Sequence, residues 1–91
     1  MKREIKIELG GCINLYERLS NEDAPRSIAL AIRTFQRSKI NREKILIMVD
    51  QRIPGNDLEK TILSIEKLQK SAIFNKKEFL REMGLLIKLI T

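Results

Sequence analysis

The sequence contains no histidine and no tryptophan, and its one cysteine is Cys12. Without histidine, the chain lacks the side chain that most often acts as a general base near neutral pH. Zinc sites built from cysteine and histidine are excluded by the same counts. A lone cysteine forms no intrachain disulfide, which is typical of a reducing compartment. We therefore expect a cytoplasmic protein that is not an enzyme and binds no metal or other cofactor, with Cys12 as a small buried residue.

Long apolar runs and glycine-rich loops are also absent. No apolar run approaches the roughly 18 residues needed to cross a bilayer. Residues 1–4 are charged and have no apolar segment after them of the kind found in secretory signals. Of the four glycines, only Gly10 and Gly11 are adjacent, so the chain has no glycine-rich phosphate loop. These absences argue against a membrane partner and against catalysis on nucleotides.

Positive charge is what the sequence has in excess. Its 91 residues include 18 Lys and Arg against 12 Asp and Glu, which gives a formal net charge of +6. A basic surface favours polyanions such as DNA, RNA or an anionic membrane face. The length indicates a single domain, and a monomer of this size buries only about 60–65% of its unfolded surface. Dimerisation would add to such a small core.

Residues 3–9 carry the pattern of a strand. Ile5, Ile7 and Leu9 alternate with charged residues, and this period of two predicts a half-buried strand. A single strand cannot pair its own backbone groups, so it needs a partner. The same strand of a second copy is the simplest partner. An edge strand of an α+β domain fits the pattern equally well.

Helical spacing of apolar residues continues through the rest of the chain. We expect N-caps at Asp23, Asn41 and Asn75, and a stop at Pro54. The run 45–49 is compatible with a buried strand, although the first turn after Asn41 favours a helix. The predicted helices span residues 12–21, 24–38, 42–52, 57–73 and 76–90.

An N-terminal run of alternating aliphatic residues (4–9) precedes a short amphipathic segment (13–19) and a second helix (26–35) that ends at Phe35. In this order, residues 1–38 resemble the ribbon-helix-helix family of DNA-binding proteins, of the CopG and Arc type. The resemblance implies a mostly α fold. Its dimeric ribbon-helix-helix head, one strand and two helices, would cover residues 1–40. A three-helix C-terminal cap over residues 41–91 would belong to the same compact domain.

The resemblance also implies a mode of DNA binding. Paired strands of two copies would enter the major groove, and the start of the second helix would hold a phosphate near Arg26 and Ser27. Arg33, Arg37, Lys39 and Arg42 would position the duplex without reading it, although arginines at helical spacing usually form only a solvated face. The implied DNA-binding residues are Lys2, Arg3, Glu4, Lys6, Glu8, Arg26, Ser27, Arg33, Arg37 and Lys39. The implied dimer interface consists of Ile5, Ile7, Leu9, Ile28, Ile32 and Phe35.

A ribbon-helix-helix head followed by three helices is similar to the ParR-type adaptors of plasmid partition systems. Such adaptors bind repeated centromere DNA as dimers and couple it to a filament-forming partner protein. The resemblance therefore implies a homodimer that binds double-stranded DNA sequence-specifically. It would act as a plasmid partition adaptor or as a small repressor in transcription regulation.

Other functions remain compatible with the sequence. A phage or plasmid inhibitor could dock on a host protein through the apolar segment 85–90. A winged-helix DNA binder fits if residues 45–49 form a strand. A membrane-surface role for the basic helix 76–90 is disfavoured, because Glu78 and Glu82 offset its cations.

Overall fold

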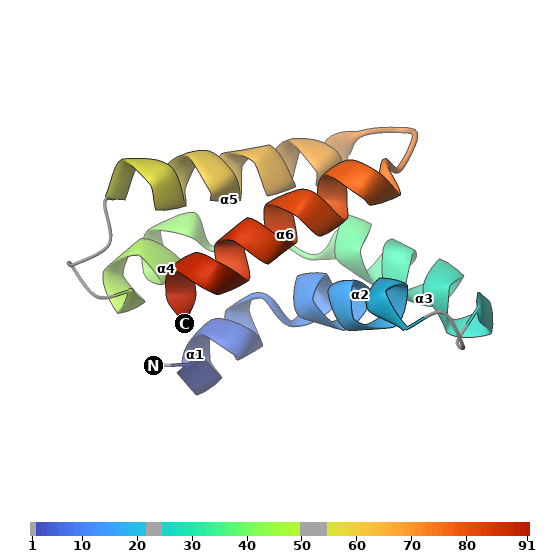
Figure 1. The fold of residues 1–91 in the computed structure, drawn as a ribbon, viewed down its shortest axis with the longest axis horizontal. Coiled ribbons are helices and arrows are strands. Elements are labelled where there is room, and N and C mark those ends of the chain that lie inside the picture. The colour runs from blue at the N-terminus through green and yellow to red at the C-terminus, as the bar shows by residue number, and fades with distance from the viewer. Residues whose placement is uncertain (1, 22–24, 50–54) are drawn as a thin grey trace.

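The structure, a computed structural model, describes residues 2–21, 25–49 and 55–91. All regular secondary structure within these ranges is α-helical, and Figure 1 shows how the helices are arranged. In chain order the helices are α1 (Lys2–Glu8), α2 (Gly10–Ser20), α3 (Pro25–Arg37), α4 (Arg42–Met48), α5 (Gly55–Lys70) and α6 (Lys76–Ile90).

The predicted N-terminal strand is wrong, because its residues form α1. Ile5 and Leu9 are each 1% exposed, whereas Ile7 is 69% exposed. A strand would have placed all three side chains on one face, but a helix separates Ile7 from the other two. The spacing from Ile5 to Leu9 continues through buried Cys12 and Leu19, which makes one helical stripe. Three alternating residues were too few to distinguish this stripe from a strand. The ribbon-helix-helix head is therefore not formed.

The glycine pair begins α2, and only Leu9 lies between it and the end of α1. Gly11 sits where α2 meets the end of α3. A Cβ atom at Gly11 would lie 3.2 Å from Ser38 Oγ and 3.3 Å from the carbonyl oxygen of Thr34. The absence of a side chain thus permits this close approach of α2 to α3. Around Gly10 the space is open.

The helices form two antiparallel pairs that pack on one another. α2 packs against α3, and α5 packs against α6. The pairs meet where α2 contacts α6 and where α3 contacts α5, while α4 packs on α5 and α1 packs on α4 and α2. Figure 1 shows α5 and α6 running along the long axis of the molecule, with α1, α2 and α3 on the opposite side.

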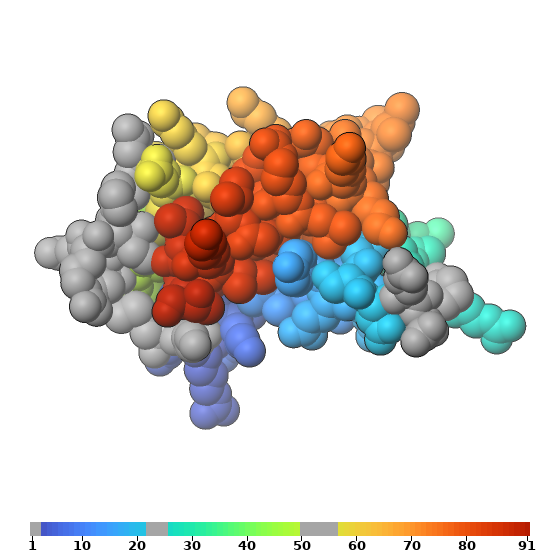
Figure 2. Space-filling model, in the orientation of Figure 1, coloured from blue at the N-terminus to red at the C-terminus, as the bar shows by residue number. Residues whose placement is uncertain are grey.

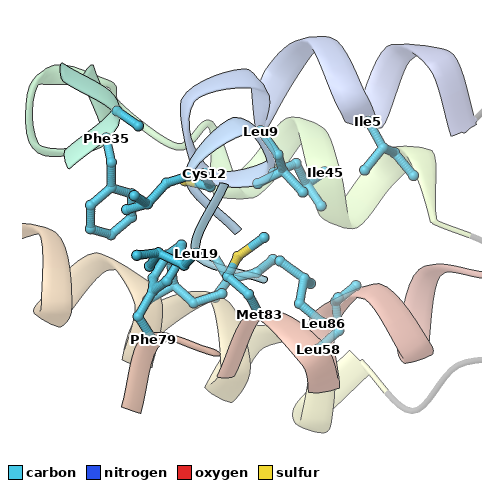
Figure 3. Close-up of a cluster of buried hydrophobic side chains, with 14 of the residues drawn as sticks. Ile5, Leu9, Cys12, Leu19, Phe35, Ile45, Leu58, Phe79, Met83 and Leu86 are labelled. Carbon is cyan, nitrogen blue, oxygen red and sulfur yellow. The ribbon is translucent and has the colours of Figure 1, made fainter. Parts of the chain in front are cut away.

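The core lies between these pairs, as Figure 3 shows. Phe35 of α3 packs edge-on against Phe79 of α6, with 4.7 Å between ring centroids, and against Phe74, at 5.9 Å. The expected apolar stripes of the last two helices are confirmed, because Leu58, Ile62 and Ile65 of α5 and Phe79, Met83 and Leu86 of α6 are all fully or almost fully buried.

Two predicted N-caps are confirmed. The Oδ1 atoms of Asn41 and Asn75 accept hydrogen bonds, both 3.1 Å long, from the backbone N–H groups of Lys44 and Glu78. Each bond satisfies a donor that the first turn of a helix leaves unpaired. The side chain of Glu78 pairs with Arg81 at 2.6 Å. Asp23 and Pro54, the other expected boundary residues, lie outside the described ranges.

Residues 45–48 of the ambiguous run 45–49 belong to α4, which ends at Met48. Ile45 is fully buried in the core, and Val49 follows the helix in an extended conformation. The winged-helix interpretation is wrong for the described part of the chain, because it requires a strand here and none is present among those residues.

Candidate nucleic-acid interface

The residues expected to read DNA bases do not form a ribbon face. Arg3, Glu4 and Lys6 are exposed on α1. Glu8 is partly buried and accepts a hydrogen bond from Lys44 Nζ of α4 at 2.5 Å. Within α1, Glu4 and Glu8 offset much of the charge of the basic residues, which include Lys2 at its start. The helix therefore concentrates little net charge, and one of its carboxylates already has a cationic partner.

The residues expected at the dimer interface mostly serve the core of one chain. Ile5, Leu9 and Phe35 are at most 1% exposed without any second copy. Ile28 and Ile32 of α3 pack against the same core while partly exposed. Only Ile7 among the six is largely solvent-exposed. The ribbon interface predicted from the sequence is therefore wrong: most of its side chains already contribute their apolar surface to the fold of one chain.

The arginines of α3 do form a coherent surface. Arg26, Arg33 and Arg37 are all exposed and recur at helical spacing, so they share one stripe of the helix. The stripe covers eleven residue steps, or about 16 Å along the axis. Leu30, which is 68% exposed, lies on it between the first two arginines. Ser27 is partly buried beside this stripe.

The arginine stripe ends where hydrogen bonds join the C-terminal ends of α3 and α5. The side-chain Nε2 atom of Gln69 on α5 lies 2.6 Å from the carbonyl oxygen of Phe35 and 3.0 Å from that of Ser38. The same atom lies 3.1 Å from Ser38 Oγ. Gln69 thus satisfies carbonyl groups that the last turn of α3 leaves without helical donors. This contact holds the ends of two helices, and the cations on them, in a fixed relation.

A groove of about 460 Å³ opens at this junction, and three cations line it. They are Arg37 at the end of α3, Lys39 in the following connection and Lys70 at the end of α5. Glu66 is the only carboxylate among the described lining residues. None of the three cations forms an ion pair with a described carboxylate. We call Arg37, Lys39 and Lys70 the basic groove.

A second depression of about 540 Å³ adjoins the basic groove and carries less positive charge. The two share Lys39, Ile40 and Glu66. The second is also lined by Arg42, but Glu8 and Glu43 outweigh that added cation. Positive charge is therefore concentrated toward the ends of α3 and α5 and diminishes toward α1 and α4.

The cations at these helix ends also have a structural role. Arg37 lies in the last turn of α3, and Lys67 and Lys70 lie in the last turn of α5. Cations at a helix C-terminus interact favourably with its exposed carbonyl groups, typically by about 0.3–1 kcal/mol each. That interaction explains their placement along each helix. It does not neutralise them, so an anion can still bind to the groove.

Cys12 takes no part in this surface. It is 1% exposed, and burial raises the pKa of its thiol to about 12. The thiol therefore stays protonated near neutral pH, and the reactive thiolate does not form. This agrees with the expectation of a small buried residue. Among the described residues, no cluster of acidic and cysteine side chains could hold a metal ion.

No helix in the described ranges is long and apolar enough to cross a membrane. No family model, curated protein or solved structure matches this chain. The geometry and charge of the chain itself are therefore what point to a function.

Sequence reasoning selected Arg37 and Lys39 but missed Lys70, Glu66 and Gln69. The missing residues belong to α5, which lies about thirty positions further along the chain. A signal for Lys70 was present, since Lys67 and Lys70 close a predicted helix with positive charge. Nothing local, however, indicated that the end of α5 would meet the end of α3.

Proposed function

We propose that this protein binds the phosphate backbone of double-stranded nucleic acid through the arginine stripe of α3 and the basic groove at its end. The observation that carries the proposal is the convergence of Arg37, Lys39 and Lys70 on one groove without carboxylate partners among the described residues. Phosphate oxygens are the natural counterions of such a surface, and their neutralisation releases condensed cations from the nucleic acid.

The stripe and the groove together suit an extended polyanion better than a small one. Arg26 and Arg33 continue the positive charge along α3, away from the groove. A free phosphate would occupy only the groove, whereas a strand of phosphates can follow the helix. Contacts of this kind position a duplex but do not read its sequence. Sequence-specific recognition, which depended on the ribbon, is not part of this proposal.

A duplex is favoured over a single strand because none of the aromatic side chains is fully exposed. The chain has one tyrosine, three phenylalanines and no tryptophan. The three phenylalanine rings pack against one another, and Tyr16 packs against the core. Proteins that bind single strands without sequence preference commonly stack bases on exposed aromatic rings. Recognition of a regular backbone needs no such ring.

The proposal is tested by fluorescence anisotropy with a labelled duplex of about 20 base pairs over a salt titration. The variant Lys39→Ala/Lys70→Ala removes two cations from the basic groove. The control variant Lys60→Ala/Lys88→Ala removes the same charge from two exposed lysines outside the groove. We expect the groove variant to flatten the slope of log K against log salt by about two units.

The control variant should keep the slope of the unmodified protein. Circular dichroism shows whether each variant retains its helices, so that loss of binding is not confused with loss of fold. A slope near zero for the unmodified protein would refute binding to the backbone. Equal losses in the two variants would show that only diffuse charge is involved and that the groove is not a site.

A further inference from the structure

A different surface of the molecule has an apolar floor and cationic edges. A groove of about 490 Å³ lies between the first half of α5 and the last turns of α6. Figure 2 shows these two regions side by side, with the end of α6 in red beside the start of α5 in yellow. The groove is lined by Asp57, Lys60, Thr61, Leu85, Lys88 and Leu89.

We propose that this groove docks an acidic amphipathic helix of a partner protein. The partner helix would place apolar side chains on Leu85 and Leu89 and carboxylates beside Lys60 and Lys88. This inference concerns a surface separate from the basic groove and does not depend on nucleic-acid binding.

The apolar floor comes from a second stripe on α6. The core stripe of this helix contains Phe79, Met83 and Leu86, which are fully buried. Leu85 and Leu89 lie beside that stripe, one turn apart, and Leu85 is 46% exposed while Leu89 is partly exposed. Side chains four residues apart lie next to each other on a helix surface. The pair thus presents a continuous apolar strip that the fold leaves partly uncovered.

The wall of the groove formed by α5 has few polar groups that need a hydrogen-bond partner from a ligand. The hydroxyl of Thr61 donates a hydrogen bond to the carbonyl oxygen of Asp57 at 2.8 Å, so it needs no partner from a ligand. A helix that packs its apolar face here would therefore not leave the hydroxyl group of Thr61 buried without a hydrogen-bond partner. Hydrophobic grooves of this kind are a common mode of helix recognition, with contacts repeating every three to four residues of the bound helix.

The positive charge at the edges of the groove favours an acidic partner helix. Lys60 and Lys88 are exposed on opposite walls of the groove and form no ion pair with a described carboxylate. Among the described residues of the lining, Asp57 is the one carboxylate, and it lies in the first turn of α5, where the helix N-terminus favours negative charge. Because the N-terminus of the helix already offsets Asp57, the two lysines dominate the rim. A bound helix that carries Asp or Glu beside its apolar face complements them.

A second copy of this chain fits the groove less well. Each chain has a net charge of +6, so two copies repel one another at long range. A two-fold contact through this groove would also bring the lysines of both copies to the same interface. An acidic partner helix avoids both the long-range repulsion and the clustering of lysines at the interface.

The test uses a fluorescein-labelled peptide of about 18 residues that is long enough to form a helix. Its leucines repeat at helical spacing and are flanked by glutamates. Anisotropy measures binding to the full chain, and NMR shifts of backbone amides locate the site. We expect shifts centred on Lys60, Leu85, Lys88 and Leu89. The variant Lys60→Glu/Lys88→Glu should weaken binding by about tenfold and should bind a matched peptide with lysines in place of the glutamates.

The control variant Lys39→Glu/Lys70→Glu makes the same change in charge at the basic groove and should leave peptide binding unchanged. Leu85→Ser alters only a partly exposed side chain and should weaken binding without loss of helical content. Equal losses in both double variants, or shifts centred elsewhere, would overturn the proposal.

Two further measurements distinguish the other occupants. If sedimentation shows a dimer that Leu85→Ser dissociates, the groove is filled by a second copy, and the proposal is wrong. If vesicles of phosphatidylserine and phosphatidylcholine displace the peptide, and Lys60→Glu/Lys88→Glu abolishes that displacement, the surface is a lipid-binding one and the proposal fails. A monomer that binds the acidic peptide and is indifferent to vesicles supports it.

Discussion

Lys44 Nζ on α4 lies 2.5 Å from Glu8 Oε1 on α1 and joins residues that are 36 positions apart. The pair crosses the contact between the N-terminal helix and α4. This ion pair engages the carboxylate of Glu8, which a DNA-reading ribbon would have presented to the bases.

Glu8→Gln should therefore have a small effect on stability and none of the effect expected for a base-reading residue. The lysine is 55% exposed, and ion pairs near the surface contribute about 0–1 kcal/mol. We expect the free energy of unfolding to fall by no more than that, as measured by urea denaturation. Affinity for duplex should stay the same or rise, because a negative charge is removed. A large loss of affinity would show that Glu8 contacts DNA.

The substitutions Ile5→Ala and Ile7→Ala form a matched pair that reports the conformation of residues 3–9. Ile5 is 1% exposed, so its truncation should lower the free energy of unfolding by about 2–5 kcal/mol. Ile7 is 69% exposed, and its truncation should change stability by less than about 0.5 kcal/mol. Chemical denaturation monitored by circular dichroism measures both. Similar losses at the two positions would indicate an alternating strand instead of α1.

The two adjacent glycines should respond to alanine in opposite directions. Gly10→Ala meets open space and replaces a residue that is unfavourable in helices, so it should stabilise the protein by up to about 1 kcal/mol. Gly11→Ala brings a Cβ atom within 3.2 Å of Ser38 Oγ, which is itself held by a 2.8 Å hydrogen bond to Phe35. Because Ser38 cannot move freely, we expect a loss of stability. Thermal denaturation of the two variants provides the comparison, and a gain at both positions would contradict the close packing of α2 on α3.

Stability should decline at alkaline pH partly because of Cys12. Burial raises the pKa of its thiol from 9.0 to about 12, so between these values the unfolded chain loses the proton and the folded chain retains it. The unfolded state then binds fewer protons, and the free energy of unfolding falls as the pH rises from about 9 to 12. Below pH 9 this contribution is constant. Cys12→Ala should flatten the profile in that range when denaturation is measured at several pH values.

Thiol labelling gives a second measure of the same burial. At pH 8, Cys12 of the native protein should react with a thiol reagent far more slowly than in the urea-unfolded chain. Fast labelling of the native chain would show that the α2–α3 contact opens readily.

The helices after residue 10 were predicted in the right places because each carries an apolar stripe or a capping residue of its own. The predicted helices 42–52 and 57–73 nevertheless run past the observed ends at Met48 and Lys70. α5 and α6 illustrate the first point, since their stripes and the cap at Asn75 are local signals that tertiary packing reinforces. The segment around Ile7 failed for the opposite reason. Its three aliphatic residues are compatible with the period of a strand and with that of a helix. Only the burial of Ile5 and Leu9 against α4 and α2 shows that the helix is formed.

The candidate site was predictable only in part for a related reason. Arg37 was selected as an outward-facing residue of the predicted helix 24–38, and Lys39 as a basic residue directly after it. Lys70 becomes their neighbour only because Gln69 joins α5 to the end of α3. Contacts between residues this far apart depend on the assembled core, and no local pattern in the sequence encodes them.

The contact between α2 and α6 joins two helices that are more than fifty residues apart in the chain. During synthesis α2 leaves the ribosome well before α6, which packs on it together with α3. Until α6 emerges, Leu15 and Leu19 have no complete core to enter and remain accessible to chaperones. We therefore expect nascent chains stalled before residue 76 to be more protease-sensitive than the full chain, because their core lacks Phe79, Met83 and Leu86.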